Sequence, residues 1–191
     1  MAHAEALPDE VLDKVLEQIG VLLHGAFDSE QLSGAEIGLG ETFDVWVLEA
    51  DAVIRSTDDL RLLANPTGRW HHQVSINGVV EAFARSIPLG ATPDSWRVVE
   101  VFKSPLAGKI DKAIVRVDDL HIVGDPLARL LIVPAYQVHA FWLLNDENVE
   151  QVLVIDRPEQ FIHLHADQLL SYHEFLEALR REQHIIGRVR S

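Results

Sequence analysis

Residues 69–86 read RWHHQVSINGVVEAFARS, and this stretch holds the clearest structural signal in the chain. Asn77 and Gly78 stand between two runs of residues that favour β-strands. Both residues accept the positive φ angles of a type I′ turn, so the pair predicts a two-residue β-hairpin. The turn predicts four opposed pairs: Ile76 with Val79, Val74 with Glu81, His72 with Phe83, and Trp70 with Arg85.

This register would give the hairpin one apolar face and one polar face. The apolar face would carry Trp70, His72, Val74, Ile76, Val79 and Phe83, with Glu81 and Arg85 among them, and the other face would carry Arg69, His71, Gln73, Ser75, Ala82, Ala84 and Ser86. Side chains alternate along a strand, so a slip of one residue would bury the wrong set. The unusual feature is three ionisable groups on the apolar face.

Composition limits the classes of protein that fit this chain. Its 191 residues, 48% hydrophobic and 24% charged, are typical of a single globular domain spanning 1–191. The absence of cysteine excludes disulfides, thiolate metal sites and a cysteine nucleophile, and is consistent with the cytoplasm. The formal net charge of −14 disfavours nucleic acid and anionic membranes as partners. No apolar run is long enough to span a membrane.

Two amphipathic helices are predicted from their end signals. The first covers residues 8–23, with proline and acidic residues in its first turn and Gly25 as a left-handed stop. The second opens at a capping box formed by Ser171 and Glu174 and runs to about Gln183.

The remaining segments are predicted to form strands and connections. Before the hairpin we expect a connection over 27–42, a strand over 43–48, and a brief helix capped by Ser56 or Thr57 and ended by 65–68. After the hairpin we expect strands over 96–103 and 113–118, joined by a turn at 104–108. The apolar run over 130–144 should have a bulge or an edge at Pro134, and a hairpin loop at 145–148 should lead to a strand over 149–155. Together these elements predict an α+β fold. Its mostly antiparallel sheet would have about five to seven strands, with the N-terminal and C-terminal helices packed on it.

The hairpin contains the first candidate site. Glu81 and Arg85 would be diagonal neighbours of His72, with Trp70 and Phe83 forming an apolar wall. An imidazole, a carboxylate and a guanidinium on an apolar face could bind a small anionic molecule or act as an acid–base group. The alternative is that these charges pair at the rim of the core and have a structural role.

A second candidate is the string His163-Leu164-His165-Ala166-Asp167. Two histidines at i and i+2 of a strand point to one face about 6.6 Å apart, a separation that one metal ion can bridge. The string resembles the first part of the H-x-H-x-D-H motif of the metallo-β-lactamase family, with Gln168 in place of the final histidine. The resemblance implies a metal-dependent hydrolase using His163, His165 and Asp167. In a straight strand, however, Asp167 would lie about 13 Å from His163, so the preferred expectation is no metal and no other cofactor.

A third pattern is the string of residues 83–88, Phe-Ala-Arg-Ser-Ile-Pro, which follows the glycine turn, with Pro105-Leu106 further along the chain. It resembles the chorismate lyase family, which implies an antiparallel sheet enclosing a small aromatic carboxylate. Where that family has an Arg-Glu pair before the turn, this chain has Trp70, His71 and His72.

The sequence therefore favours a non-catalytic protein that binds a small molecule or another protein. A small enzyme acting on an anionic organic substrate is the alternative, and a homo-oligomer is left open. The core should contain Trp70, Phe83, Trp96, Phe102 and Trp142. Purified protein should hold no stoichiometric zinc.

Overall fold

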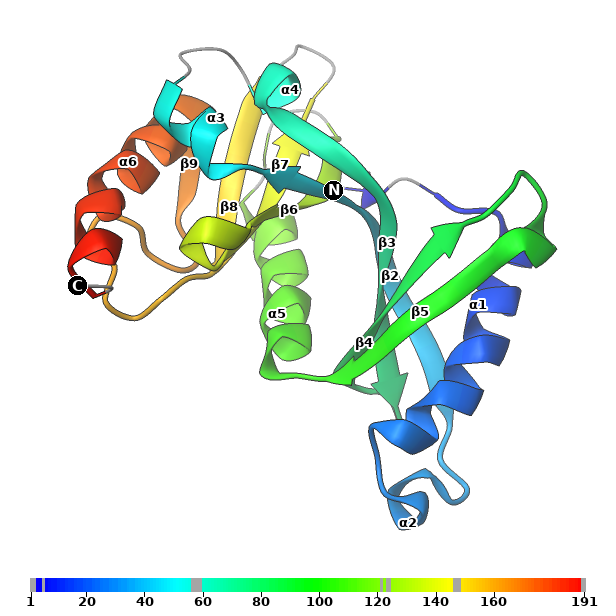
Figure 1. Ribbon diagram of the computed structural model, residues 1–191. Coiled ribbons are helices and arrows are strands. Elements are labelled where there is room, and N and C mark those ends of the chain that lie inside the picture. Colours follow the sequence, from blue (N-terminus) through cyan, green and yellow to red (C-terminus); the bar gives the residue numbers. More distant parts are fainter. Residues whose placement is uncertain are drawn as a thin grey trace. The chain divides into compact units, whose positions relative to one another are not determined.

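The computed structural model describes residues 3–4, 6–55, 60–120, 122, 125–145 and 149–189. Figure 1 shows mixed α and β structure. The strands are β1 (His3–Ala4), β2 (Ile37–Leu48), β3 (Ala64–Ile76), β4 (Val79–Pro88), β5 (Trp96–Lys103), β6 (Leu127–Val133), β7 (Val138–Leu144), β8 (Glu150–Asp156) and β9 (Leu169–Ser171). The helices are α1 (Asp9–Leu22), α2 (Ser29–Leu32), α3 (Ala50–Arg55), α4 (Leu60–Leu63), α5 (Pro105–Asp119) and α6 (Tyr172–Val189), with 3-10 turns η1 (Leu23–Gly25), η2 (Pro93–Ser95) and η3 (Pro134–Tyr136).

The strands form a mostly antiparallel sheet. Their hydrogen-bonded order is β5-β4-β3-β2-β6-β7-β8-β9, and β1 pairs with β6 beside this path. The β2–β6 pair is parallel, whereas β3–β4, β4–β5, β6–β7, β7–β8 and β8–β9 are antiparallel. The α+β class is therefore confirmed. In the described part of the chain the path contains eight strands, so the predicted range of five to seven is too low.

The chain divides into two compact units. Unit 1 comprises Met1–His3, Val45–Thr67 and Ala113–Ser191, and unit 2 comprises Ala4–Asp44 and Gly68–Lys112. Strands β2 and β3 contribute residues to both. Such a division describes packing and does not test independent folding, so the single domain stays a prediction.

Helix α1 and the sheet of unit 2 share one core. Helix α1 has bounds close to the predicted 8–23, but the predicted left-handed stop at Gly25 is wrong. The chain continues from α1 into the 3-10 turn η1, which includes Gly25. Its stripe of Val11, Val15 and Ile19 is buried and belongs to the same cluster as Val74 and Trp96 of the sheet. The stripe follows the i, i+4, i+8 spacing that places side chains on one helix face.

Helix α5 replaces a predicted turn and strand. Residues 104–108 were expected to turn and 113–118 to form a strand, but the chain is helical over Pro105–Asp119. The Ser104 hydroxyl oxygen accepts the Leu106 N–H, and Pro105 occupies the first helical position, where a missing N–H costs nothing. Ala107, Ile110, Ala113 and Val117 are buried at helical spacing. The apolar residues of this segment repeat every three to four positions, as in a helix, and not every two positions, as the predicted strand requires.

Strand β2 also differs from the prediction. It begins at Ile37, inside the segment 27–42 that was expected to be a connection, and α2 lies in the same segment. The predicted cap at Ser56 or Thr57 lies outside the described residues. Residues 65–68 do not end a helix but belong to β3.

The core of unit 1 is built on the apolar run over 130–144. Pro134 opens η3, and Gln137 adopts a left-handed conformation at φ 54°, so the run folds back as the hairpin β6–β7 instead of forming one bulged strand. Val138, Ala140 and Trp142 point to one side, as predicted, and pack with residues of α6. In the connection between β7 and β8, Asn145 Oδ1 accepts the Val149 N–H at 2.8 Å. Residues 146–148 of the predicted loop lie outside the described part of the chain.

Helix α6 confirms the capping box, but it continues to Val189, beyond the predicted end at about Gln183. The Ser171 N–H and hydroxyl both donate to the Glu174 carboxylate, and Ser171 Oγ accepts the Glu174 N–H. These hydrogen bonds, first from the side chain and then from the backbone of Ser171, lower the pKa of Glu174. Phe175, Leu176 and Leu179 are buried in the core of unit 1. None of the helices in the described ranges has the length and apolar character to cross a membrane.

Candidate functional site

The β3–β4 hairpin has the predicted turn but not the predicted register. Asn77 and Gly78 have φ angles of 53° and 78°, and Ile76 is opposite Val79. The register then shifts: Ser75 pairs with Val80, but Val74 pairs with Ala82. Glu81 is therefore the extra residue of a β-bulge. A bulge moves every later side chain of the strand to the other face, as a slip of one residue does.

The bulge separates the residues of the predicted hairpin site. Trp70 and His72 lie on the face that packs against α1, where the rings of Trp70 and Trp96 are 5.9 Å apart. Phe83 and Arg85 lie on the opposite face, because Phe83 pairs with Gln73 and Arg85 pairs with His71. The Glu81 side chain is 44% exposed, and its carboxylate lies 3.6 Å from the Lys103 ammonium. The predicted register, which made Glu81 and Arg85 diagonal neighbours of His72, is therefore wrong. Whether these residues bind a ligand stays a prediction.

His72 is part of the core of unit 2. Its side chain is completely buried, and its two ring nitrogens lie 3.0 Å from Thr42 Oγ1 and 2.7 Å from Ser86 Oγ. Burial lowers the pKa of His72 to about 4. The ring therefore stays neutral near pH 7 and links β2, β3 and β4. No ligand can reach it without opening the core, which argues against a role in acid–base catalysis.

The opposite face of the hairpin carries a connected set of aromatic and charged side chains. We call it the aromatic–arginine face, and its members are Arg69, His71, Gln73, Phe83, Arg85, Glu100 and Phe102. The cross-strand pairs are Arg85 with Glu100 and Phe83 with Phe102. The ring of Phe83 stacks on His71 at 4.8 Å and lies 5.4 Å from the ring of Phe102. The guanidinium carbon of Arg85 is 5.3 Å from the Phe83 ring.

The side chains of this face are buried at one end and exposed at the other. His71 and Gln73 are buried, and Gln73 Nε2 donates to the carbonyl oxygen of Ala107 in α5. The exposed end contains Phe102, which is 44% exposed, and Arg69, whose side chain is 51% exposed. Glu100 accepts from Arg85 at 2.8 Å and lies 4.0 Å from Arg69. Two guanidinium groups therefore surround one carboxylate.

The prediction that five aromatic residues are mostly buried holds for four of them, and Phe102 is the exception. Phe83, Trp96 and Trp142 are buried, and Trp70 is half-buried against the core of unit 2. Phe102 is exposed because β5 is the last strand of the hydrogen-bonded path and α1 packs on its other face. The sequence analysis did not predict that Arg69, His71, Glu100 and Phe102 lie on one surface. Their only signal is the alternation within each strand, which cannot be combined across strands until the bulge is known.

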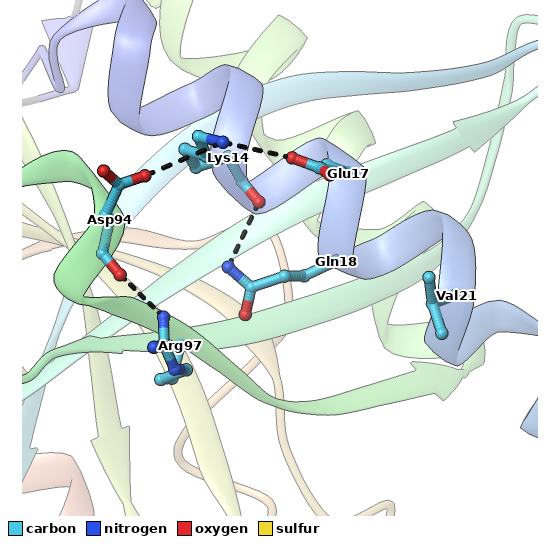
Figure 2. A pocket seen from close by; sticks show the side chains of 6 residues that line it. All are labelled: Lys14, Glu17, Gln18, Val21, Asp94 and Arg97. Carbon is cyan, nitrogen blue, oxygen red and sulfur yellow. Dashed lines mark hydrogen bonds and ion pairs between the residues drawn. The ribbon is translucent and has the colours of Figure 1, made fainter.

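Unit 2 also has an open depression of about 370 Å³ between α1 and β5. Figure 2 shows that its charged side chains already have partners within the protein. Lys14 Nζ lies 3.4 Å from Glu17 and 3.6 Å from Asp94, and the Arg97 guanidinium donates to the carbonyl oxygen of Asp94 at 2.7 Å. Two lysine and arginine charges and two carboxylate charges line this depression, and each group already contacts protein, so the depression offers little net charge to a ligand.

Gln18 in this depression has a clear structural role. Its Nε2 donates to the carbonyl oxygen of Trp96 at 3.1 Å, and its Oε1 accepts the N–H of Val98 at 3.0 Å. The carboxamide thus binds the backbone of the edge strand β5 as a neighbouring strand would. Covering an edge in this way reduces its tendency to pair with another chain.

Replacement of Gln18 by alanine is expected to lower the free energy of unfolding by about 1–2 kcal/mol, because two partly buried hydrogen bonds are lost. Chemical denaturation monitored by circular dichroism measures this loss. The matched control is Glu17→Ala, one residue earlier on the exposed side of α1, which should change stability by less than about 0.5 kcal/mol. Equal losses in the two variants would contradict the role of Gln18.

The alternative metal site is not supported by its geometry. His163, His165 and Asp167 are exposed and lie in the irregular segment between β8 and β9, not on a strand, and Asp167 adopts a φ of 61°. The segment is anchored by the buried side chains of Phe161 and Leu164. Among the described residues no group of three or more His, Cys, Asp or Glu side chains could hold a metal ion.

Comparisons of this chain with protein-family models, with curated proteins and with solved structures found no match. The chemistry of the aromatic–arginine face is therefore the basis for proposing a function.

Proposed function

We propose that the protein is a non-catalytic binding protein that holds an aromatic carboxylate on the aromatic–arginine face. The observation that supports this most directly is the exposed end of the face. There a phenyl ring that is 44% exposed and a guanidinium side chain that is 51% exposed, those of Phe102 and Arg69, belong to one connected set of contacts. Aromatic and arginine side chains dominate the binding energy of many interfaces.

The chemistry of the face fits an anion with an aromatic ring. A guanidinium group binds a carboxylate through two parallel hydrogen bonds, and a phenyl ring accepts another ring in a tilted or offset arrangement. Arg85 uses one terminal nitrogen on Glu100, and its buried Nε has no partner among the described residues. Two guanidinium groups lie close together beside Glu100, on a chain whose net charge is −14. A guanidinium group is a favourable partner for a carboxylate.

Binding is favoured over catalysis by the placement of the titratable groups. His72 and His71 are completely buried, and Glu100 is already paired with arginine. An acid–base catalyst must come within hydrogen-bond reach of the reacting atoms, and these groups are engaged or enclosed. A cytoplasmic location belongs to the same proposal and rests on the lack of cysteine.

The ligand could be a free small molecule or the C-terminus of a protein that ends in an aromatic residue. The test uses both sources. Amide chemical shifts of labelled protein are followed during titration with benzoate and 3-phenylpropanoate, and with an N-acetylated peptide ending in phenylalanine. The same peptide with an amidated C-terminus removes the negative charge and should not bind.

Two variants localise the binding. Arg69→Gln and Phe102→Ala should each weaken it at least severalfold without changing the fold, because both side chains are substantially exposed. Arg116→Gln removes an exposed arginine of α5 outside the face and should leave binding unchanged. The proposal is wrong if neither the free acids nor the peptide acid shifts residues of β3, β4 and β5. It is equally wrong if the two variants bind like the wild type.

A further inference from the structure

The Asn77-Gly78 turn has a chemical property that is separate from the proposed function. Both residues are exposed. Asn77 makes two hydrogen bonds to Glu36: its backbone N–H donates to the Glu36 carbonyl oxygen at 2.8 Å, and its Oδ1 accepts the Glu36 N–H at 3.0 Å. The turn is thereby tied to the residue that precedes β2.

We propose that Asn77 is a site of spontaneous deamidation in the folded protein. The backbone nitrogen of Gly78 attacks the side-chain carbonyl carbon of Asn77, and a carbon–nitrogen bond forms. The nitrogen loses its proton, the bond to the side-chain amide nitrogen breaks, and ammonia leaves. Water then opens the resulting five-membered imide at either carbonyl, which yields aspartate or isoaspartate. The only co-reactant is water, and no electron is transferred to or from the chain.

Three features of the turn favour the attack. Gly78 has no side chain to shield its nitrogen, and even a Cβ placed there would meet no atom within 4 Å. Among the described residues, no backbone hydrogen bond of the Gly78 N–H is found outside the strands. The Glu36 N–H already points at Oδ1, the oxygen on which negative charge develops during the attack. A donor placed at such an oxygen stabilises the charged intermediate.

The two products differ in what they do to the hairpin. Aspartate keeps an oxygen that can accept the Glu36 N–H. Isoaspartate inserts the side-chain methylene into the backbone, so a two-residue turn can no longer adopt the type I′ geometry that matches the strands. The β3–β4 turn would then lose its attachment to Glu36.

The chain provides internal controls. Asn145 Oδ1 also accepts a backbone N–H, that of Val149 at 2.8 Å, but the residue after Asn145 is aspartate and not glycine. Asn65 precedes Pro66, whose nitrogen has no hydrogen and cannot form the imide. If the Gly78 nitrogen is required, neither control should react on the same time scale.

The experiment incubates the folded protein for several days at mildly alkaline pH in oxygen-18 water and analyses its tryptic peptides by mass spectrometry. The peptide of residues 70–85 should gain the mass of one deamidation with incorporated oxygen-18, and isoaspartyl methyltransferase should label it. Gly78→Ala should slow the reaction severalfold.

Glu36→Pro tests whether the native turn is the reacting state. It removes the N–H that faces Oδ1, so the reaction should slow severalfold, with circular dichroism showing that the fold persists. If the reaction occurred only in unfolded chains, this N–H would be remote and the rate would not change. An unchanged or faster rate in Glu36→Pro, or a wild-type rate at Asn77 no higher than at Asn145, would overturn the proposal.

Discussion

Trp142→Ala is expected to lower the free energy of unfolding by about 3–5 kcal/mol, the usual cost of deleting a large aromatic side chain from a core. Trp142 is completely buried in unit 1, and its ring meets that of Trp46 edge-on at 5.2 Å. The guanidinium carbon of Arg129 lies 5.2 Å from the same ring. The indole N–H has no acceptor among the described residues, so the expected loss comes from packing and not from a broken hydrogen bond. Urea denaturation measures it.

Phe102→Ala is the control for this loss of stability. Both residues were predicted to be buried, but Phe102 is 44% exposed. Removal of this side chain should cost about 1–2 kcal/mol, less than for Trp142, because only part of its apolar surface is buried in the folded protein. A loss for Phe102→Ala as large as that for Trp142→Ala would mean that Phe102 is part of a core.

Acidification is expected to destabilise the protein through His72. The pKa of His72 is about 4 in the folded protein, whereas an unfolded histidine has a pKa near 6.5. Between pH 6.5 and pH 4, His72 is therefore protonated in the unfolded chain but neutral in the folded protein. The free energy of unfolding falls as the pH decreases through this range. The loss attributable to His72 is about 2 kcal/mol between pH 7 and pH 5, and about 3 kcal/mol by pH 4.

The variant His72→Gln isolates this effect. Glutamine keeps a donor and an acceptor between Thr42 and Ser86 but cannot take up a proton in this range. The variant should be less stable than the wild type at pH 7, but its stability should decline less between pH 7 and pH 5, by about 2 kcal/mol. The other histidines and the carboxylates contribute to both proteins and cancel in the difference. Parallel pH profiles for the two proteins would show that His72 is not the group responsible.

The parts of the fold that could be predicted from sequence are those fixed by neighbouring residues. The Asn77-Gly78 turn, α1 and the capping box at Ser171 were all predicted and are all present. Each depends on interactions within about four residues, such as a positive φ, a helical stripe or a side chain that caps its own helix. Their energies do not depend on what the rest of the chain does.

The errors occurred where local signals were ambiguous. The segment of α5 has apolar residues compatible with either a helix or a short strand, and a proline and a glycine near its start suggested a turn. In the protein the segment is helical, with Ile110 and Val117 buried on one side. For short apolar segments, packing against the rest of the protein decides between the two periods.

The candidate site depends on one residue that the sequence does not mark. Nothing in the composition of β4 shows that Glu81 forms a bulge; Val80 or Ala82 could have been the extra residue. Without the bulge, Arg85 and Phe83 would face α1 beside His72. With it, Arg85 reaches Glu100, and Phe83 stacks on His71.

The residues alone were therefore sufficient for the turn, the terminal helices and the α+β class, because short-range chemistry determines them. The membership of the aromatic–arginine face was decided only by tertiary structure. It joins side chains of β3, β4 and β5 through pairings such as Arg85 with Glu100, which lie 15 residues apart in the sequence. Strand pairing is a long-range interaction, and a single bulge changes which side chains meet.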